Sequence, residues 1–191
     1  MLSLILIITN MKPTILSMLF LIIFYNTCLG QSSKPEYGPV FDDIGPTYNL
    51  KNADFVPDST SVLKAIFDID YMPKDSLASN SLISSLHRYL NMHVKSGIKE
   101  SNISLGFVLH GDSTKDALTD EAYLKKYGTK NPNTNLIKTL SEHGVDMFLC
   151  GQSASYSGIS KSEIMPEIKI ALSAMTVLTV YQSEGYSLIK F

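Results

Sequence analysis

Apolar runs alternate with helical patterns along most of this chain, and that alternation restricts its fold more than any other feature. Runs rich in β-branched and aromatic residues predict buried strands, and apolar residues at helical spacing between them predict helices. Asn131 is expected to cap the third helix, with Pro132 in its first turn. Strands that alternate with helices form a parallel sheet covered on both faces, so we expect an α/β fold. The expected strands are 62–69, 103–110, 145–150, 167–172 and 186–191, and the expected helices are 79–94, 120–127, 131–144 and 173–184.

Residues 1–30 have the pattern of a secretory signal peptide. Lys12 is their only charged residue, and an apolar core follows it. Cys28 and Gly30 then place small residues just before a cleavage site at Gln31. We therefore expect an exported, periplasmic protein with no stable membrane insertion after cleavage.

Three questions about this N-terminal segment stay open at the sequence level. Met11 is a more ordinary start than Met1, because a lysine and a proline follow it. The apolar residues are almost numerous enough for an uncleaved membrane anchor. Cys28 would be the modified residue of a lipoprotein, although the residues before it are bulkier and more polar than a lipidation site prefers.

The segment 31–61 is expected to be an arm that precedes the folded domain. Its prolines and glycines prevent a regular helix or a central strand. Aromatic residues lie between them, so the segment is either a disordered tether or an arm that packs on the domain or on a neighbouring subunit. The prolines are residues 35, 39, 46 and 57, and the aromatic residues are 37, 41, 48 and 55.

The composition of the mature chain excludes several classes of protein. Without Lys12 it carries 15 basic and 18 acidic side chains, a formal charge of −3, which is unfavourable for binding nucleic acid. The 161 residues after the cleavage site suit one domain. One cysteine, Cys150, is left, so an internal disulfide is excluded and the thiol is buried, paired with another chain, or reactive.

Cys150 is the strongest candidate for chemistry, because it ends a predicted buried strand. Right-handed crossovers place the ends of parallel strands, here Asp68, His110 and Cys150, along one edge of the sheet, where ligands bind in such folds. The backbone amides of Gly151, Gln152 and Ser153, with the two polar side chains, would stabilise a thiolate if they turned into a helix start or an anion nest. Free cysteine is also among the most buried residue types, so a purely structural role stays open.

His110 and Gly111 are further candidate binding residues at the same edge. The imidazole would act as a base or proton donor to Cys150, or it would bond a backbone carbonyl, and no third member of a triad is identifiable. The four histidines have no metal-ligand spacing, and the glycines form no phosphate loop, so we expect neither a metal nor a cofactor. The polar loop 154–161 would flank the thiol.

Several short motifs resemble the DsrE/DsrF-like family over residues 62–191. The resemblance implies a three-layer α/β/α domain with a mainly parallel five-stranded sheet, which assembles into homotrimers or homohexamers. For some members it also implies a cysteine, matched here by Cys150, that carries persulfide sulfur between donor and acceptor proteins. Those members are cytoplasmic, whereas this chain is expected to be exported. The motifs are FDI at 67–69, RYLN at 88–91, VLHG at 108–111, NPN at 131–133, CGQS at 150–153, LSAMT at 172–176 and EGYSLIKF at 184–191.

Two functions are consistent with these residues. The first is a thiol-based sulfur carrier, with a sulfurtransferase-like activity through Cys150. The second is a non-catalytic oligomeric protein that binds a small ligand or a partner at the sheet edge. A depressed pKa and solvent access at Cys150 would favour the first function, and full burial would favour the second.

Overall fold

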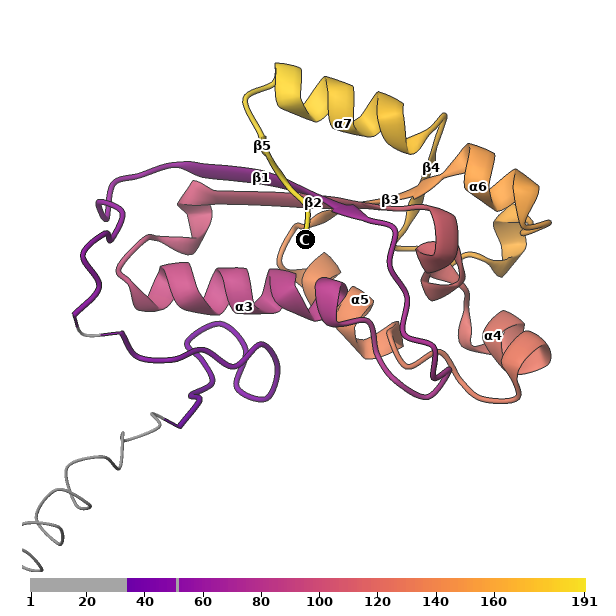
Figure 1. Cartoon of the computed structure of the whole chain (residues 1–191), viewed down its shortest axis with the longest axis horizontal. Helices are drawn as coiled ribbons and strands as arrows, with labels where there is room; N and C mark the ends of the chain where they lie inside the picture. The colour runs from indigo at the N-terminus through magenta and orange to yellow at the C-terminus, as the bar shows by residue number, and fades with distance from the viewer. Residues whose placement is uncertain (1–33, 51) are drawn as a thin grey trace, which may run out of the picture. The chain divides into compact units, whose positions relative to one another are not determined.

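A five-stranded, all-parallel sheet forms the centre of the protein, in a computed structural model that describes residues 34–50 and 52–191 (Figure 1). The strand order is β4-β3-β2-β1-β5. The sequence-based prediction of an α/β fold with a mainly parallel five-stranded sheet is therefore confirmed. The strands are β1 (Leu63–Ile69), β2 (Ile103–Leu109), β3 (Asp146–Cys150), β4 (Lys169–Ala171) and β5 (Ser187–Ile189).

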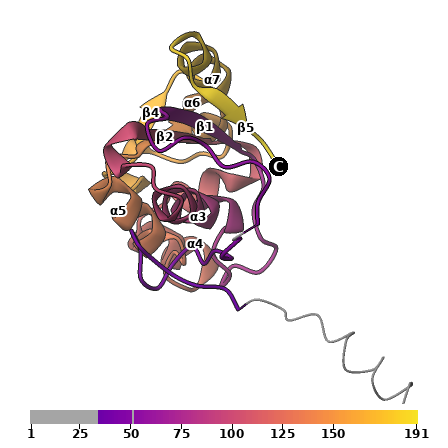
Figure 2. The ribbon, with the colours of Figure 1, turned by 90° about the vertical axis from the view of Figure 1, so that its left-hand side faces the viewer.

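Helices cover the two faces of this sheet unequally (Figure 2). The helices α3, α4 and α5 lie on one side, and α7 lies on the other (Figure 1). The larger apolar core fills the first side, where Phe67, Phe107 and Met147 of the sheet meet Leu86 and Ile137 of the helices. The helices are α3 (Ser81–Lys95), α4 (Asp120–Tyr127), α5 (Thr134–Glu142), α6 (Gly151–Tyr156) and α7 (Ala174–Ser183), with 3₁₀ helices η1 (Glu100–Asn102), η2 (Gly111–Ala117) and η3 (Lys161–Glu163).

The predicted cap of the third helix is wrong by two residues. The helix α5 begins at Thr134, and its N-cap residue is Asn133 and not Asn131. The Asn131 side chain instead donates to the backbone carbonyls of Asp116 and Leu118, at 2.9 and 2.7 Å. Its Oδ1 accepts from the amide of Asn133 at 2.9 Å, so the asparagine stays bonded to the residue before the helix while its NH₂ group satisfies buried carbonyls.

Two other sequence-based assignments also change at the edges of the sheet. The segment 154–161 was expected to be a loop, but α6 extends through Tyr156, so the polar turn after β3 is the first turn of a helix. The predicted strands 167–172 and 186–191 shrink to three residues each, in β4 and β5. Edge strands pair on one side only, which limits how much of each run the ladder fixes.

The part of the arm around Phe41 packs on α3, whereas Leu50 and Phe55 farther along are 71% and 88% exposed. Phe41 is buried, and its ring lies 4.6 Å from the ring centroids of both His87 and His143. The Asn91 side chain accepts hydrogen bonds from the amides of Val40 and Phe41. It also donates to the carbonyls of residues 41, 44 and 45. One buried amide thus satisfies five backbone groups of an otherwise irregular loop.

Among the described residues, no helix is long and apolar enough to cross a membrane. The predicted signal peptide, with Lys12, Cys28 and Gly30, lies outside the described residues.

Candidate functional site

Cys150 lies at the carboxyl end of β3, where the chain passes directly into α6. It is the N-cap residue of that helix, and 5% of its surface is exposed. Its side chain faces α7, in a small apolar cluster with Ile66 of β1, Val108 of β2, and Ala174 and Val177 of the helix. The thiol therefore lies between the sheet and α7, on the face of the sheet that fewer helices cover.

Hydrogen bonds around the sulfur favour its ionised form. Burial acts to raise the pKa of the Cys150 thiol, but the Ser153 hydroxyl and the amides of Ser153, Ala174 and Gln152 bond the sulfur, and the net effect is a lowered pKa. Donors that point at an anion stabilise it over the neutral thiol. The arrangement can hold a thiolate at a lower pH than a free cysteine allows.

Gly151 is required here by close packing rather than by an unusual backbone conformation. A Cβ atom at this position would lie 2.6 Å from the carbonyl oxygen of Ala171 and 3.4 Å from Cγ2 of Ile170. The side-chain amide of Gln152 donates to the carbonyl oxygen of Leu172 at 3.3 Å. The missing side chain at Gly151 lets the first turn of α6 lie close to β4. The Gln152 hydrogen bond ties the same turn to the segment that leads into α7.

A hydrogen bond joins the end of β2 to the thiol site. The amide of Gly111 donates to Oγ of Ser153 at 3.3 Å, and the same hydroxyl bonds the Cys150 sulfur. Leu109 and Leu149 are paired residues on the adjacent strands β2 and β3, so His110 and Cys150 are the next residues along them. The candidate binding residues His110, Gly111, Gly151, Gln152 and Ser153 thus all lie around one end of two neighbouring strands.

The His110 ring takes part in a charged network that the sequence did not reveal. Its Nε2 lies 2.6 Å from Oδ1 of Asp68, at the end of β1, so its partner is a carboxylate and not a backbone carbonyl. Lys190, just after β5, donates to Oδ2 of Asp68 at 2.8 Å and to Oδ2 of Asp70 at 2.9 Å. Hydrogen bonds to the two carboxylates raise the pKa of Lys190, and the Lys190 ammonium lowers the pKa of Asp70.

Sequence reasoning missed two of the groups at this edge. Ala174 contributes an amide at the start of α7, and Ser173 before it caps the helix by accepting from the amide of Thr176 at 3.0 Å. That cap is visible in the sequence as a serine before an apolar helix, but its proximity to Cys150 is not. Lys190 is the next-to-last residue and lies within the motif EGYSLIKF, but no pattern in the sequence indicated that it would contact Asp68.

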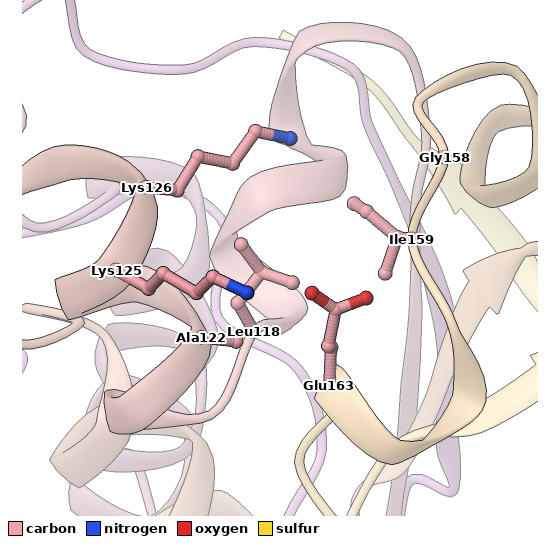
Figure 3. A pocket seen from close by; sticks show the side chains of 7 residues that line it. All are labelled: Leu118, Ala122, Lys125, Lys126, Gly158, Ile159 and Glu163. Carbon is pink, nitrogen blue, oxygen red and sulfur yellow. The ribbon is translucent and has the colours of Figure 1, made fainter.

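A pocket of about 270 Å³ lies elsewhere, between α4 and the segment that leads into η3 (Figure 3). Leu118, Ala122 and Ile159 form its apolar part. Lys125 points toward the carboxylate of Glu163, which itself accepts hydrogen bonds from the amide and hydroxyl of Ser160 (Figure 3). The Glu163 carboxylate thus already has hydrogen-bond partners within the protein. Within residues 34–50 and 52–191, no three metal-ligating side chains come together.

Comparison with known proteins places the fold in a family. A family model described as the DsrE/DsrF-like family matches residues 76–191. The protein of unknown function MTH1491 from Methanobacterium thermoautotrophicum has a similar structure, with a TM-score of 0.51 and 15% identity over 68% of this chain and 99% of that one. The ychN protein from E. coli aligns with a TM-score of 0.49 and 20% identity, over the same shares. No curated protein matches the chain.

Proposed function

Because the chain belongs to the DsrE/DsrF-like family, a family associated with sulfur relay, we propose that it carries sulfur as a persulfide on Cys150. The observation that supports this most directly is the position of Cys150 at the end of β3 and the start of α6, where hydrogen bonds from three amides and the Ser153 hydroxyl act to lower the thiol pKa despite burial. A sulfur carrier needs a thiolate both to accept sulfur and to act as the leaving group when the sulfur is passed on.

The loading step needs no external oxidant. The Cys150 thiolate attacks the outer sulfur of a donor persulfide, a new S–S bond forms, the donor S–S bond breaks, and the donor leaves as a thiolate. The outer sulfur of the resulting persulfide lies about 2 Å beyond Sγ. This extension suits a thiol that is itself only 5% exposed, because the transferable atom projects away from the buried one.

Intact-mass analysis tests the proposal. The full chain, carrying Cys28→Ser so that Cys150 is its only cysteine, is treated with inorganic polysulfide and freed of excess reagent. We expect a mass gain of one sulfur atom that a reducing agent reverses and that Cys150→Ser abolishes. A folded protein that gains no sulfur, or gains it equally with Cys150→Ser, would overturn the proposal.

A second candidate function follows from the low exposure of the thiol. A non-catalytic binding protein would keep Cys150 as a packing residue beside Val108 and Val177. In that case alkylation of Cys150 requires unfolding of the protein. Fast alkylation of the folded protein at neutral pH favours the carrier, and alkylation that occurs only in denaturant favours the binding protein.

We propose that the protein assembles into a homotrimer or homohexamer. The support is the apolar surface around α7: Leu172 and Met175 are 73% and 76% exposed, and Val180 is also exposed. A second subunit is the simplest cover for a helix with apolar residues on more than one face. Light scattering of the full chain at micromolar concentration should give a multiple of the monomer mass, and a monomer would contradict this proposal.

We also propose that the protein is exported and cleaved before Gln31. The support is the sequence alone: one basic residue, an apolar core, and small residues at Cys28 and Gly30. N-terminal sequencing of protein from the periplasm should begin at residue 31. A start within residues 1–25, or a lipid on Cys28, would reject it.

A further inference from the structure

We propose that His110, held by Asp68 and Lys190, is the base that deprotonates the thiol of the incoming sulfur acceptor. This inference rests on the proposed carrier function and assigns a second catalytic residue to the same site. Asp68 and Lys190 are positioning residues, since they act through the imidazole. The observation behind the proposal is the continuous set of contacts from His110 Nε2 to Asp68, from Asp68 to Lys190, and from Lys190 to Asp70.

The groups that bond the Cys150 sulfur are different from the group that bonds His110. The groups that bond the Cys150 sulfur are the Ser153 hydroxyl and three backbone amides, and these already favour its thiolate. The Nε2 of His110 bonds the Asp68 carboxylate instead, at 2.6 Å. The Cys150 thiolate therefore does not depend on the imidazole. In the transfer half-reaction the thiol of the sulfur acceptor must also lose its proton, and the groups that bond the Cys150 sulfur are donors and not bases.

His110 is placed where an incoming thiol would approach. It follows Leu109, which pairs with Leu149 next to Cys150, so the two residues extend from adjacent strands about 5 Å apart. Val108 and Cys150 contribute to the same apolar cluster under α7, and the extended backbone of His110 continues that alternation onto the same face as Val108. The His110 side chain keeps 26% of its surface exposed, against 11% for Asp68. The ring is thus reachable from solvent, and its anchor is largely covered.

The hydrogen bond to Asp68 orients the imidazole ring. When Nε2 carries the hydrogen and donates it to Asp68, the lone pair of the neutral imidazole lies on Nδ1. Asp68, Asp70 and Lys190 together carry a formal charge of −1, which falls to zero when the ring becomes an imidazolium. A carboxylate that orients a histidine and stabilises its charged form is a recurring device of acid–base catalysis.

The transfer step balances without an oxidant or a reductant. Nδ1 of His110 takes the proton of the acceptor thiol, and the acceptor sulfur attacks the outer sulfur of the Cys150 persulfide. A new S–S bond forms on the acceptor, and the bond between the two sulfurs at Cys150 breaks. The electron pair of that bond stays on Sγ, which becomes the thiolate that the amides stabilise. The products are the acceptor persulfide, the Cys150 thiolate and the His110 imidazolium.

The dependence of transfer on thiol acidity tests this role. The full chain with Cys28→Ser is loaded with polysulfide, and loss of sulfur is followed by mass with either 2-mercaptoethanol, a weakly acidic thiol, or 4-nitrothiophenol, which is already ionised at neutral pH. We expect His110→Gln to slow transfer to 2-mercaptoethanol by about a hundredfold, the lower end of what a positioned base contributes. Transfer to 4-nitrothiophenol should be nearly unchanged, because that thiol needs no base.

Asp68→Asn should reproduce this selective loss, since an amide facing Nε2 no longer fixes the reactive tautomer. Lys169→Met is the matched control: it removes a 2.9 Å ion pair with Asp146 between two other strands of the sheet and should change neither rate. Alkylation of Cys150 should be equal in all these proteins. Variants that slow both thiols equally, or neither, would overturn the role of His110 while leaving the carrier intact. Failure of the parent protein to load sulfur would overturn both proposals.

Discussion

Replacing Ser153 with alanine removes the largest of the contacts that lower the Cys150 pKa, the hydroxyl bonded to the sulfur. A hydrogen bond to a charged group contributes about 1.5–3 kcal/mol. At 1.36 kcal/mol for each pKa unit, its loss corresponds to a rise of roughly one to two in the thiol pKa. Three backbone amides remain, and water can enter where the hydroxyl was, so we expect a rise of about one, near the lower limit of that range.

The rate of alkylation by iodoacetamide, measured across pH, reports this change. Below the wild-type pKa, a rise of about one reduces the thiolate fraction about tenfold. The more basic thiolate is intrinsically about threefold more nucleophilic, given a Brønsted coefficient of about 0.4–0.5. Alkylation of Ser153→Ala should therefore be about threefold slower at low pH and faster than wild type at high pH, so that the two profiles cross.

Ser155→Ala is the matched control, because it makes the same substitution at an exposed position of the same short helix. It should leave the profile unchanged. The Gly111 amide also loses its 3.3 Å partner in Ser153→Ala, but this hydrogen bond is exposed, so water replaces the hydroxyl at little cost in stability. An unchanged titration midpoint in Ser153→Ala would refute the reasoning that side-chain and backbone donors hold the thiolate.

Three other substitutions test the supporting structure. Gly151→Ala should lower the free energy of unfolding in urea by about 1–3 kcal/mol, because its Cβ would lie 2.6 Å from the Ala171 carbonyl oxygen. Asn91→Leu should release the arm, so that limited proteolysis cuts near Phe41 much faster than in wild type; equal cutting would contradict its role as the anchor. Burial raises the pKa of Asp116 to about 6, so its contribution to stability is greatest below the ordinary carboxyl pKa and is lost as pH rises through about 6. Relative to Asp116→Asn, wild-type stability should fall by roughly 2 kcal/mol between pH 4 and pH 7, measured by denaturation at each pH.

The central strands were predictable because both faces of a parallel sheet are buried. The runs around Phe67, Phe107 and Met147 are almost continuously apolar, which is the pattern expected of strands that are covered on both faces. The position of Cys150 at a strand end followed from the same pattern. The short strands β4 and β5 were harder to delimit, because they lie at the edges of the sheet, where exposed residues such as Ile170 and Leu188 weaken the burial signal.

Local sequence patterns gave the wrong helix cap where an asparagine side chain bonds groups that are distant in the sequence. The sequence Asn131-Pro132-Asn133 offers two caps for one helix, and propensity favours the first, with proline in the first turn. The structure uses both asparagines around the buried Asp116: Asn131 binds its carbonyl at 2.9 Å, and Asn133 binds its carboxylate at 3.1 Å. Satisfying a buried polar cluster outweighs a better placed cap, and no local pattern shows where such a cluster forms.

The charged half of the site escaped sequence reasoning for a topological reason. Chain order places the ends of β1, β2 and β3 along one edge, but it does not say which edge strand the last segment joins. The last strand pairs with β1, with Ile189 opposite Phe67, and this register alone brings Lys190 beside Asp68 across 122 residues of chain. The pairing of β5 with β1 therefore also positions the Lys190 ammonium, which bonds the same carboxylate, Asp68, that bonds His110. If the imidazole acts on the acceptor thiol, the last residues of the chain belong to the same site as Cys150, although β2 and β1 lie between β5 and the strand of Cys150.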